Sequence, residues 1–130
     1  MAAPLTYSFD HIHVFCTDLD ATTKWFVDGV GAELVARRDS RGVPSAVLNL
    51  GGARILLRPK RDGENLQQVS GHRFGADHFG LEVSNVDATI TELRSRGVEI
   101  EVEPWDFSPQ ARIAFITGPD GVRIELVQPR

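Results

Sequence analysis

The chain has 130 residues, 42% of them hydrophobic, which is enough for one compact domain that buries roughly two thirds of its unfolded surface. The formal net charge is -4 without a basic run, which argues against nucleic acid as a partner, and no apolar run reaches the about 20 residues that cross a membrane. One cysteine excludes an internal disulfide, and the lack of a signal-peptide pattern predicts a cytoplasmic protein.

The first half of the chain predicts one strand, one helix and three further strands. Residues 9–17 alternate between apolar and polar side chains, as a half-buried strand does. Asp18 or Asp20 can cap the helix that follows, and this helix stops at Gly31. The next strands are expected over residues 32–38, 46–50 and 54–58.

The second half repeats this order. The stretch HIHVFCTDLDAT at His11 returns as HFGLEVSNVDAT at His78, 67 residues later. A GPDG sequence at Gly118 is typical of a hairpin turn between the last two strands. The expected elements are a strand over 77–84, a helix over 86–96, and strands over 98–102, 113–117 and 122–127.

Two copies of one unit of about 55 residues therefore make up a single domain over residues 1–130. We predict an α+β fold in which two tandem βαβββ modules, residues 9–59 and 76–130, form a curved mixed sheet. The polar stretch between them, residues 60–75, is called the linker, and it is the loosest part of the chain by composition.

Alternation along the strands sends His11 and His78 to the face that looks away from the helices. Glu125 shares this face on the last strand, between Ile124 and Leu126, which point under the helix. A lone strand histidine is more often a structural residue, but two at equivalent repeat positions with an inward carboxylate favour a divalent metal. His11, His78 and Glu125 are therefore the candidate ligands, and the curved sheet is expected to surround a metal-binding cavity.

The stretches DHIHVFCTDLDATTKWF, DHFGLEVSNVDA and GPDGVRIELVQP resemble the vicinal oxygen chelate superfamily. Its members include glyoxalase I, extradiol dioxygenases, methylmalonyl-CoA epimerase and the fosfomycin and bleomycin resistance proteins. The resemblance implies a first metal ligand seven residues before the acidic residue that opens the helix, which selects His11 over His13. His13 is then a neighbouring or substrate-facing group, with a plain strand role as the alternative.

Two positions depart from the patterns that this resemblance implies. Leu56 stands where glyoxalase-like and epimerase-like members carry a Glu or Gln, which counts against isomerase chemistry and leaves the two-histidine, one-carboxylate set of Fe(II) oxygenases. Phe115 stands where extradiol dioxygenases and fosfomycin thiol transferases commonly carry a tyrosine, so a substrate-binding hydroxyl is missing. We interpret the chain as a non-haem Fe(II) dioxygenase that oxygenates or cleaves an aromatic or phenolic substrate.

The candidate acid–base groups are His13 and Glu82, although an ion pair is the preferred role of Glu82, and His72 in the linker is a weaker candidate. Cys16 faces the helix and is expected to be a buried structural thiol. Among the aromatic residues, Trp25 and Phe26 are expected in the helix core.

The candidate substrate-binding residues lie on inward strand faces or near the pocket. Trp105 and Phe107 are expected in a loop that walls the pocket, with a dimer contact as the alternative. Arg54, Arg58 and Arg123 are expected at the cavity rim, where they either reach an anionic group or stay solvated. The full set is Trp105, Phe107, Phe115, Leu56, Arg54 and Arg123.

The expected cofactor is Fe(II), with Mn, Ni or Zn as alternatives. The expected partners are an aromatic small molecule, O2 and a second copy of the chain in a homodimer. Two other functions stay open: a glyoxalase-like lyase or thiol transferase that works without O2, and a metal-free binding protein of the bleomycin resistance kind. The sequence also leaves open whether the metal ligands come from one chain or are shared across a dimer.

Overall fold

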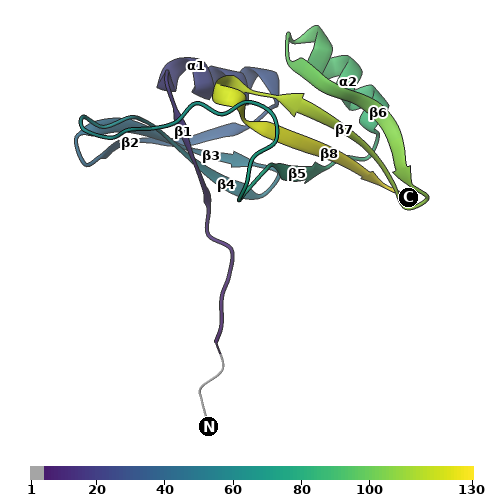
Figure 1. Ribbon diagram of the computed structural model, residues 1–130, viewed down its shortest axis with the longest axis horizontal. Helices are drawn as coiled ribbons and strands as arrows, with labels where there is room; N and C mark the ends of the chain where they lie inside the picture. The colour runs from purple at the N-terminus through teal and green to yellow at the C-terminus, as the bar shows by residue number, and fades with distance from the viewer. Residues whose placement is uncertain (1–4) are drawn as a thin grey trace.

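Eight strands form two four-stranded mixed sheets in the computed structural model, which describes residues 5–130. The first sheet has the strand order β1-β4-β3-β2 and the second has the order β5-β8-β7-β6. Figure 1 places both helices, α1 and α2, on the same side of the two sheets. The predicted α+β class with two tandem βαβββ units is confirmed.

The first module begins with β1 (Ile12–Cys16) and helix α1 (Leu19–Lys24), which continues as a wide π turn (Trp25–Gly29). The Asp18 carboxylate accepts a hydrogen bond from the Ala21 N–H at 3.0 Å, so the predicted helix cap is confirmed. An antiparallel meander completes the module: β2 (Glu33–Ser40), β3 (Val43–Leu50) and β4 (Ala53–Pro59).

The second module repeats the order with β5 (Phe79–Glu82) and helix α2 (Val86–Ser95), which Asn85 caps as Asp18 caps α1. The repeat thus uses two different side chains for the same local task, because both carry an oxygen that accepts from the first turn. Three strands complete the module: β6 (Glu99–Ser108), β7 (Ala111–Thr117) and β8 (Arg123–Pro129).

Two hairpin turns decide where their strands begin. The GPDG sequence forms a short 3-10 turn over Pro119–Gly121, and the predicted hairpin of β7 and β8 is confirmed. Between β2 and β3, Arg41 and Gly42 both have positive φ, at 51° and 94°. This two-residue turn starts β3 at Val43, earlier than predicted. Such turns favour Asn-Gly, so Arg-Gly carried no clear signal.

Strand β6 continues well past its predicted end at Val102 and runs to Ser108. Bulges in its pairing with β7 accommodate Pro104, and β6 is the outer strand of its sheet, where a missing N–H costs little. Trp105 and Phe107 therefore lie on a strand, and the prediction that they lie in a loop is wrong.

The pairing register supports the repeat that was read from the sequence. β1 and β4 run parallel with His13 opposite Leu56, and β5 and β8 run parallel with Gly80 opposite Glu125. His13 and Gly80 are separated by the same 67 residues as the two matched stretches. Leu56 and Glu125 therefore hold equivalent places in the two modules.

Buried apolar side chains of both modules form one core between the helices and the sheets. Phe26 is 0% exposed, and Trp25 packs so closely on Gly118 that a Cβ there would lie 2.9 Å from its ring. Cys16 is buried and its Sγ lies 3.5 Å from the Arg58 carbonyl oxygen, which confirms a structural thiol. Burial raises the pKa of this thiol, so the reactive thiolate is disfavoured.

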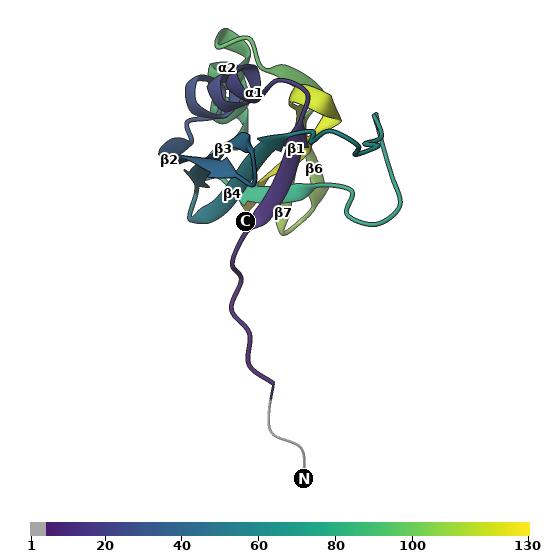
Figure 2. The same ribbon diagram turned by 90° about the vertical axis from the view of Figure 1, so that its left-hand side faces the viewer.

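The linker has no helix or strand, but hydrogen bonds tie it to both modules. Near its start, the Glu64 carboxylate accepts two hydrogen bonds from the Arg58 guanidinium, at 2.7 and 2.9 Å. Farther along, Gln68 Nε2 donates to the Asp120 carboxylate at 3.4 Å. Figure 2 shows the linker as the long teal loop that stands out to one side of the sheets.

Residues 5–11 run away from the sheets in an extended path (Figures 1 and 2), so β1 begins at Ile12 and not at residue 9 as predicted. Leu5, Tyr7 and Phe9 are exposed along this segment. Among the described residues, no helix combines the length and apolar character that a membrane span requires.

Candidate metal centre

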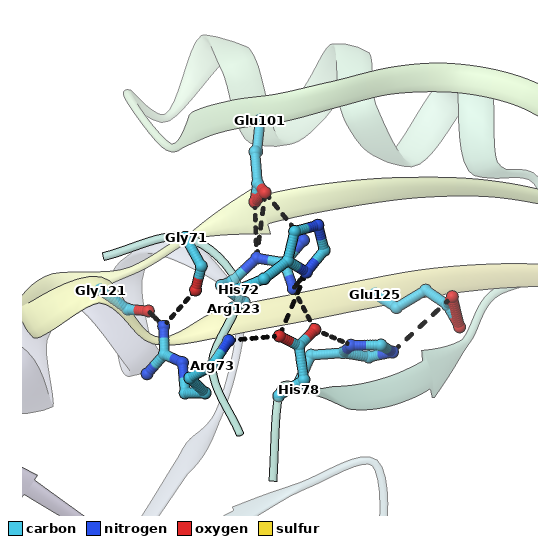
Figure 3. A network of polar contacts seen from close by, with 9 residues as sticks. Gly71, His72, Arg73, His78, Glu101, Gly121, Arg123 and Glu125 are labelled. Atoms are coloured by element: carbon cyan, nitrogen blue, oxygen red, sulfur yellow. Dashed lines mark hydrogen bonds and ion pairs between the residues drawn. The ribbon is translucent and has the colours of Figure 1, made fainter. Parts of the chain in front are cut away.

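The residues His78 and Glu125 meet on neighbouring strands of the second module. His78 stands directly before β5, and Glu125 lies on β8, which pairs with β5 in parallel. The two side chains point toward each other in Figure 3, with His78 Nε2 3.9 Å from Glu125 Oε2. Two ligand atoms that each lie about 2.1 Å from one metal ion can be at most about 4.2 Å apart. The pair therefore fits a common divalent ion.

Each candidate histidine is held by the aspartate that precedes it. His78 Nδ1 lies 2.8 Å from Asp77 Oδ2, and His11 Nδ1 lies 2.6 Å from Asp10 Oδ2. A carboxylate beside Nδ1 keeps the proton on that nitrogen and leaves the lone pair of Nε2 free to bind a metal. This is the usual arrangement around metal-binding histidines. The sequence carried this signal as the repeated Asp-His pair, and our sequence analysis missed it.

Asp77 connects His78 to the linker. Besides His78, its carboxylate accepts a hydrogen bond from the Arg73 N–H at 3.1 Å, contacts His72 Nδ1 at 3.2 Å and forms an ion pair with Arg123. The hydrogen bond with His78 comes first among the causes that hold the pKa of Asp77 far below its usual range, and the charge of Arg123 acts in the same direction. Asp77 is therefore a carboxylate at neutral pH.

Arg123 is buried beneath this group and fully paired. Its side chain is 4% exposed, and its guanidinium donates to both carboxylate oxygens of Glu101 at 2.8–3.0 Å as well as to Asp77. It lies over the Phe115 ring at 4.8 Å, and that ring packs edge-on against His78 at 4.9 Å. Arg123 lines the cavity beside His78, and two carboxylates hold its donors, so the alternative that it stays solvated is wrong and its contact with an anionic group stays a prediction.

The third candidate ligand, His11, is not grouped with the other two. It stands directly before β1, and the cavity beside His78 is lined by β1 from Ile12 to Thr17, whose N–H donates to the Asp120 carboxylate at 2.9 Å. Within residues 5–130, no three His, Cys, Asp or Glu side chains come together as a metal site. One chain thus assembles His78 with Glu125 and leaves His11 outside.

The two predicted inward arginines of the first module, Arg58 and Arg54, differ in burial. Arg58 is buried, bound to Glu64 and stacked over the Phe15 ring at 3.9 Å, so neither of its predicted roles at the rim is correct. Arg54, which is equivalent to Arg123 by register, is exposed. Its charge helps to lower the pKa of Asp10, after the larger effect of the hydrogen bond with His11.

The candidate acid–base groups lie on different modules. His13 lines the cavity beside His78 and packs against the Phe15 ring at 4.8 Å. Burial lowers the pKa of His13, and the charge of Arg58 acts in the same direction. Glu82 is exposed, and no salt bridge involves it in the part of the chain that the structure describes, so its preferred ion-pair role is wrong.

The aromatic pair on β6 shares the sheet face of the candidate ligand Glu125. Trp105 lies opposite Ile113, and Ile113 lies opposite Val127, which is two residues from Glu125 on the same face. Trp105 and Phe107 pack edge-to-face at 5.7 Å and are 47% and 63% exposed. Their assignment to substrate binding or a dimer contact stays a prediction.

The chain is similar in sequence to a known protein family and to several known proteins. The model of the Glyoxalase/Bleomycin resistance protein/Dioxygenase superfamily matches residues 8–126. The chain is 25% identical to the uncharacterized protein YwkD of Bacillus subtilis over 126 residues, 95% of this chain and 98% of YwkD. It is 27% identical to a probable lactoylglutathione lyase of Synechocystis over 128 residues, 91% of this chain and 92% of the lyase.

A solved glyoxalase family protein of Bacillus cereus has the same fold, with a TM-score of 0.81, 20% identity and coverage of 99% of this chain and 98% of that one. Proteins of this superfamily generally bind divalent metals, and many of them are enzymes. The family model matches residues 8–126, which span both modules. The chain therefore belongs to the Glyoxalase/Bleomycin resistance protein/Dioxygenase superfamily.

Proposed function

We propose that the chain is a metal-dependent enzyme whose centre is completed by a second copy. One copy provides His78 and Glu125, and the other provides His11. The observation that carries this proposal is the pair of Asp-His units, each with Nε2 left free, of which only one has a carboxylate ligand beside it. Because the first half-site lacks a partner among residues 5–130, a two-fold dimer would complete two identical centres.

The donor set favours Fe(II) and an oxygenase. Two histidines and one carboxylate are typical of non-haem Fe(II) sites, which keep open positions for the vicinal oxygens of a substrate and for O2. Leu56 supports this choice because it is equivalent to Glu125 by register and offers neither a fourth ligand nor a base. We therefore favour oxygenation or ring cleavage of a phenolic or enediol-like compound.

The protein's own groups would orient the ligands and move protons. Asp77 and Asp10 keep the proton on Nδ1 of their histidines. His13 is the first candidate for taking a proton from a bound phenol, because it lies on the strand face of His11 and on the wall of the cavity beside His78. Glu82 is a second candidate, since its carboxylate is exposed on the face of Glu125.

A glyoxalase-like lyase is the second candidate function. The observation that favours it is the similarity to a probable lactoylglutathione lyase along nearly the full length of both chains. Such an enzyme would use Mn, Ni or Zn, would require glutathione and would be indifferent to O2. The apolar Leu56 is the main argument against it.

The test is metal content and O2 uptake of anaerobically purified protein supplied with Fe, Mn, Ni and Zn. The proposal expects about one iron per chain and O2 uptake with a catechol or hydroquinone. Glu125→Ala should lose both, whereas Glu33→Gln, an exposed glutamate on β2, should keep them. Another metal with a glutathione-dependent, O2-independent activity would replace the oxygenase by the lyase. Wild-type protein without any metal would contradict both and indicate a binding protein.

A further inference from the structure

A cavity of about 430 Å³ lies where the first strands of the two modules approach each other, with the linker as its roof. This volume lies within the range of small-molecule sites. Its lining comes from β1, the linker, the start of β5 and the turn before β8. The apolar part of the lining includes Ile12, Val14, Leu66, Val69, Phe79 and Val122.

The linker packs closely against the turn between β7 and β8. Gly121 has a φ of +75°, and a Cβ at this position would lie 2.2 Å from the Val69 carbonyl oxygen. Arg73 Nη2 donates to the Gly121 carbonyl at 2.8 Å, and Gln68 binds Asp120 beside it. Specific contacts of the linker thus hold it over one side of the cavity.

Arg73 brings an uncompensated positive charge to this cavity. Its guanidinium binds only the backbone carbonyls of Gly71 and Gly121, at 3.0 and 2.8 Å, and Nε is buried without a hydrogen-bond partner. Within residues 5–130, no carboxylate lies at ion-pair distance from it, whereas Arg58 and Arg123 are each paired with carboxylates. Figure 3 shows Arg73 held by carbonyl oxygens next to the carboxylate-bound Arg123.

The other charges of the lining leave this excess in place. Lys60 also lines the cavity and has no ion pair among the described residues. Asp77 pairs with Arg123, and Asp120 keeps its charge while it accepts hydrogen bonds from the Thr17 N–H and Gln68. The lining thus holds two carboxylates against the three cations Lys60, Arg73 and Arg123. Both side-chain hydrogen bonds of Arg73 are made by Nη2, so within residues 5–130 its Nη1 has no acceptor, and an anionic ligand group would supply one.

We propose that this cavity binds a small apolar anion, such as an aromatic or branched carboxylate, with the anionic group on Arg73 and the apolar body between β1 and Phe79. The site does not depend on the proposed metal, because no metal ligand other than His78 contributes to its lining. His78 in the same wall would place such a ligand beside the metal centre when the metal is bound.

The test uses chelator-treated protein and two fluorescent probes with similar apolar bodies. One is the sulfonate 8-anilinonaphthalene-1-sulfonate, and the other is the uncharged N-phenyl-1-naphthylamine. Wild-type protein should bind both. Arg73→Met should weaken binding of the sulfonate by about tenfold or more and change binding of the neutral probe less than about twofold. Arg37→Met removes an equal charge from β2, outside the cavity, and should leave both unchanged.

Two further variants keep the test decisive. Asp120→Asn removes a negative charge from the lining and should strengthen sulfonate binding by about twofold to threefold, the opposite sign to Arg73→Met. Leu66→Asn should weaken both probes, with an unchanged circular dichroism spectrum. Equal sulfonate binding by wild type and Arg73→Met would overturn the anion assignment. Failure of wild type to bind either probe would overturn the cavity itself, without bearing on the metal content.

Discussion

The two modules carry the same Asp-His unit in two different surroundings. In the second module, Asp77 and His78 are fixed by Arg123 and the linker, and Glu125 lies beside the histidine. In the first module, Asp10 and His11 are exposed at the start of β1, and within residues 5–130 they belong to no group of three metal-binding side chains. The proposed function interprets this difference as one preformed half-site and a second unit that another copy of the chain completes.

The largest expected effect is a difference in the free energy of unfolding between variants of the two equivalent arginines, Arg123 and Arg54. Arg123→Met should lower the free energy of unfolding by about 3 kcal/mol, because it leaves Glu101 and Asp77 partly buried without their cation. Arg54→Met, at the equivalent exposed position, should change it by less than about 0.5 kcal/mol. Urea unfolding followed by circular dichroism measures both values. Similar losses for the two variants would mean that the two halves are held in the same way.

The next comparison concerns the two aspartates. Asp77→Asn and Asp10→Asn should each weaken metal binding by about 10-fold to 100-fold, because each removes the carboxylate that orients a metal-binding histidine. Only Asp77→Asn should also lower the melting temperature, since Asp77 holds Arg123 and the linker. Competition with a chelator and thermal melts provide the readouts. A metal affinity unaffected by Asp10→Asn would remove His11 from the centre.

The smallest expected effect is the acid response of the linker. The hydrogen bonds from Arg58 and the Arg61 N–H lower the pKa of Glu64 from its usual 4.5 to about 2. The ionised group is thus favoured in the folded chain, so its contribution to stability is complete above about pH 4.5 and is lost as the pH falls toward 2. Wild type should lose stability over this window more steeply than Glu64→Gln. Parallel curves for the two proteins would show that this ion pair does not stabilise the fold.

Local patterns allowed most of the fold to be predicted from the sequence. Strand alternation placed Cys16 in the core, Asp18 capped its helix and the GPDG turn marked a hairpin, because each depends on residues close together in the chain. The same reasoning failed at Pro104, where an outer strand tolerates a residue that usually ends one.

The site was less predictable because its contacts are long-range. The sequence nominated His78 and Glu125, and their neighbouring strands bring them to 3.9 Å. It could not indicate that the Arg123 guanidinium would be bound by two carboxylates, those of Glu101 on β6 and of Asp77 directly before His78. Nor could it separate His11 from the other ligands, because strand faces fix the direction of a side chain but not the packing of one module against another.

The central claim is that each metal centre takes His11 from one copy and His78 with Glu125 from another. The direct test mixes His11→Ala and Glu125→Ala proteins, unfolds and refolds them together, and measures bound metal. Neither variant alone should bind metal tightly. In the mixture, half of the dimers are mixed and each has one intact centre, so about a quarter of the wild-type metal should return. No recovery in a mixture that forms mixed dimers would contradict the shared centre.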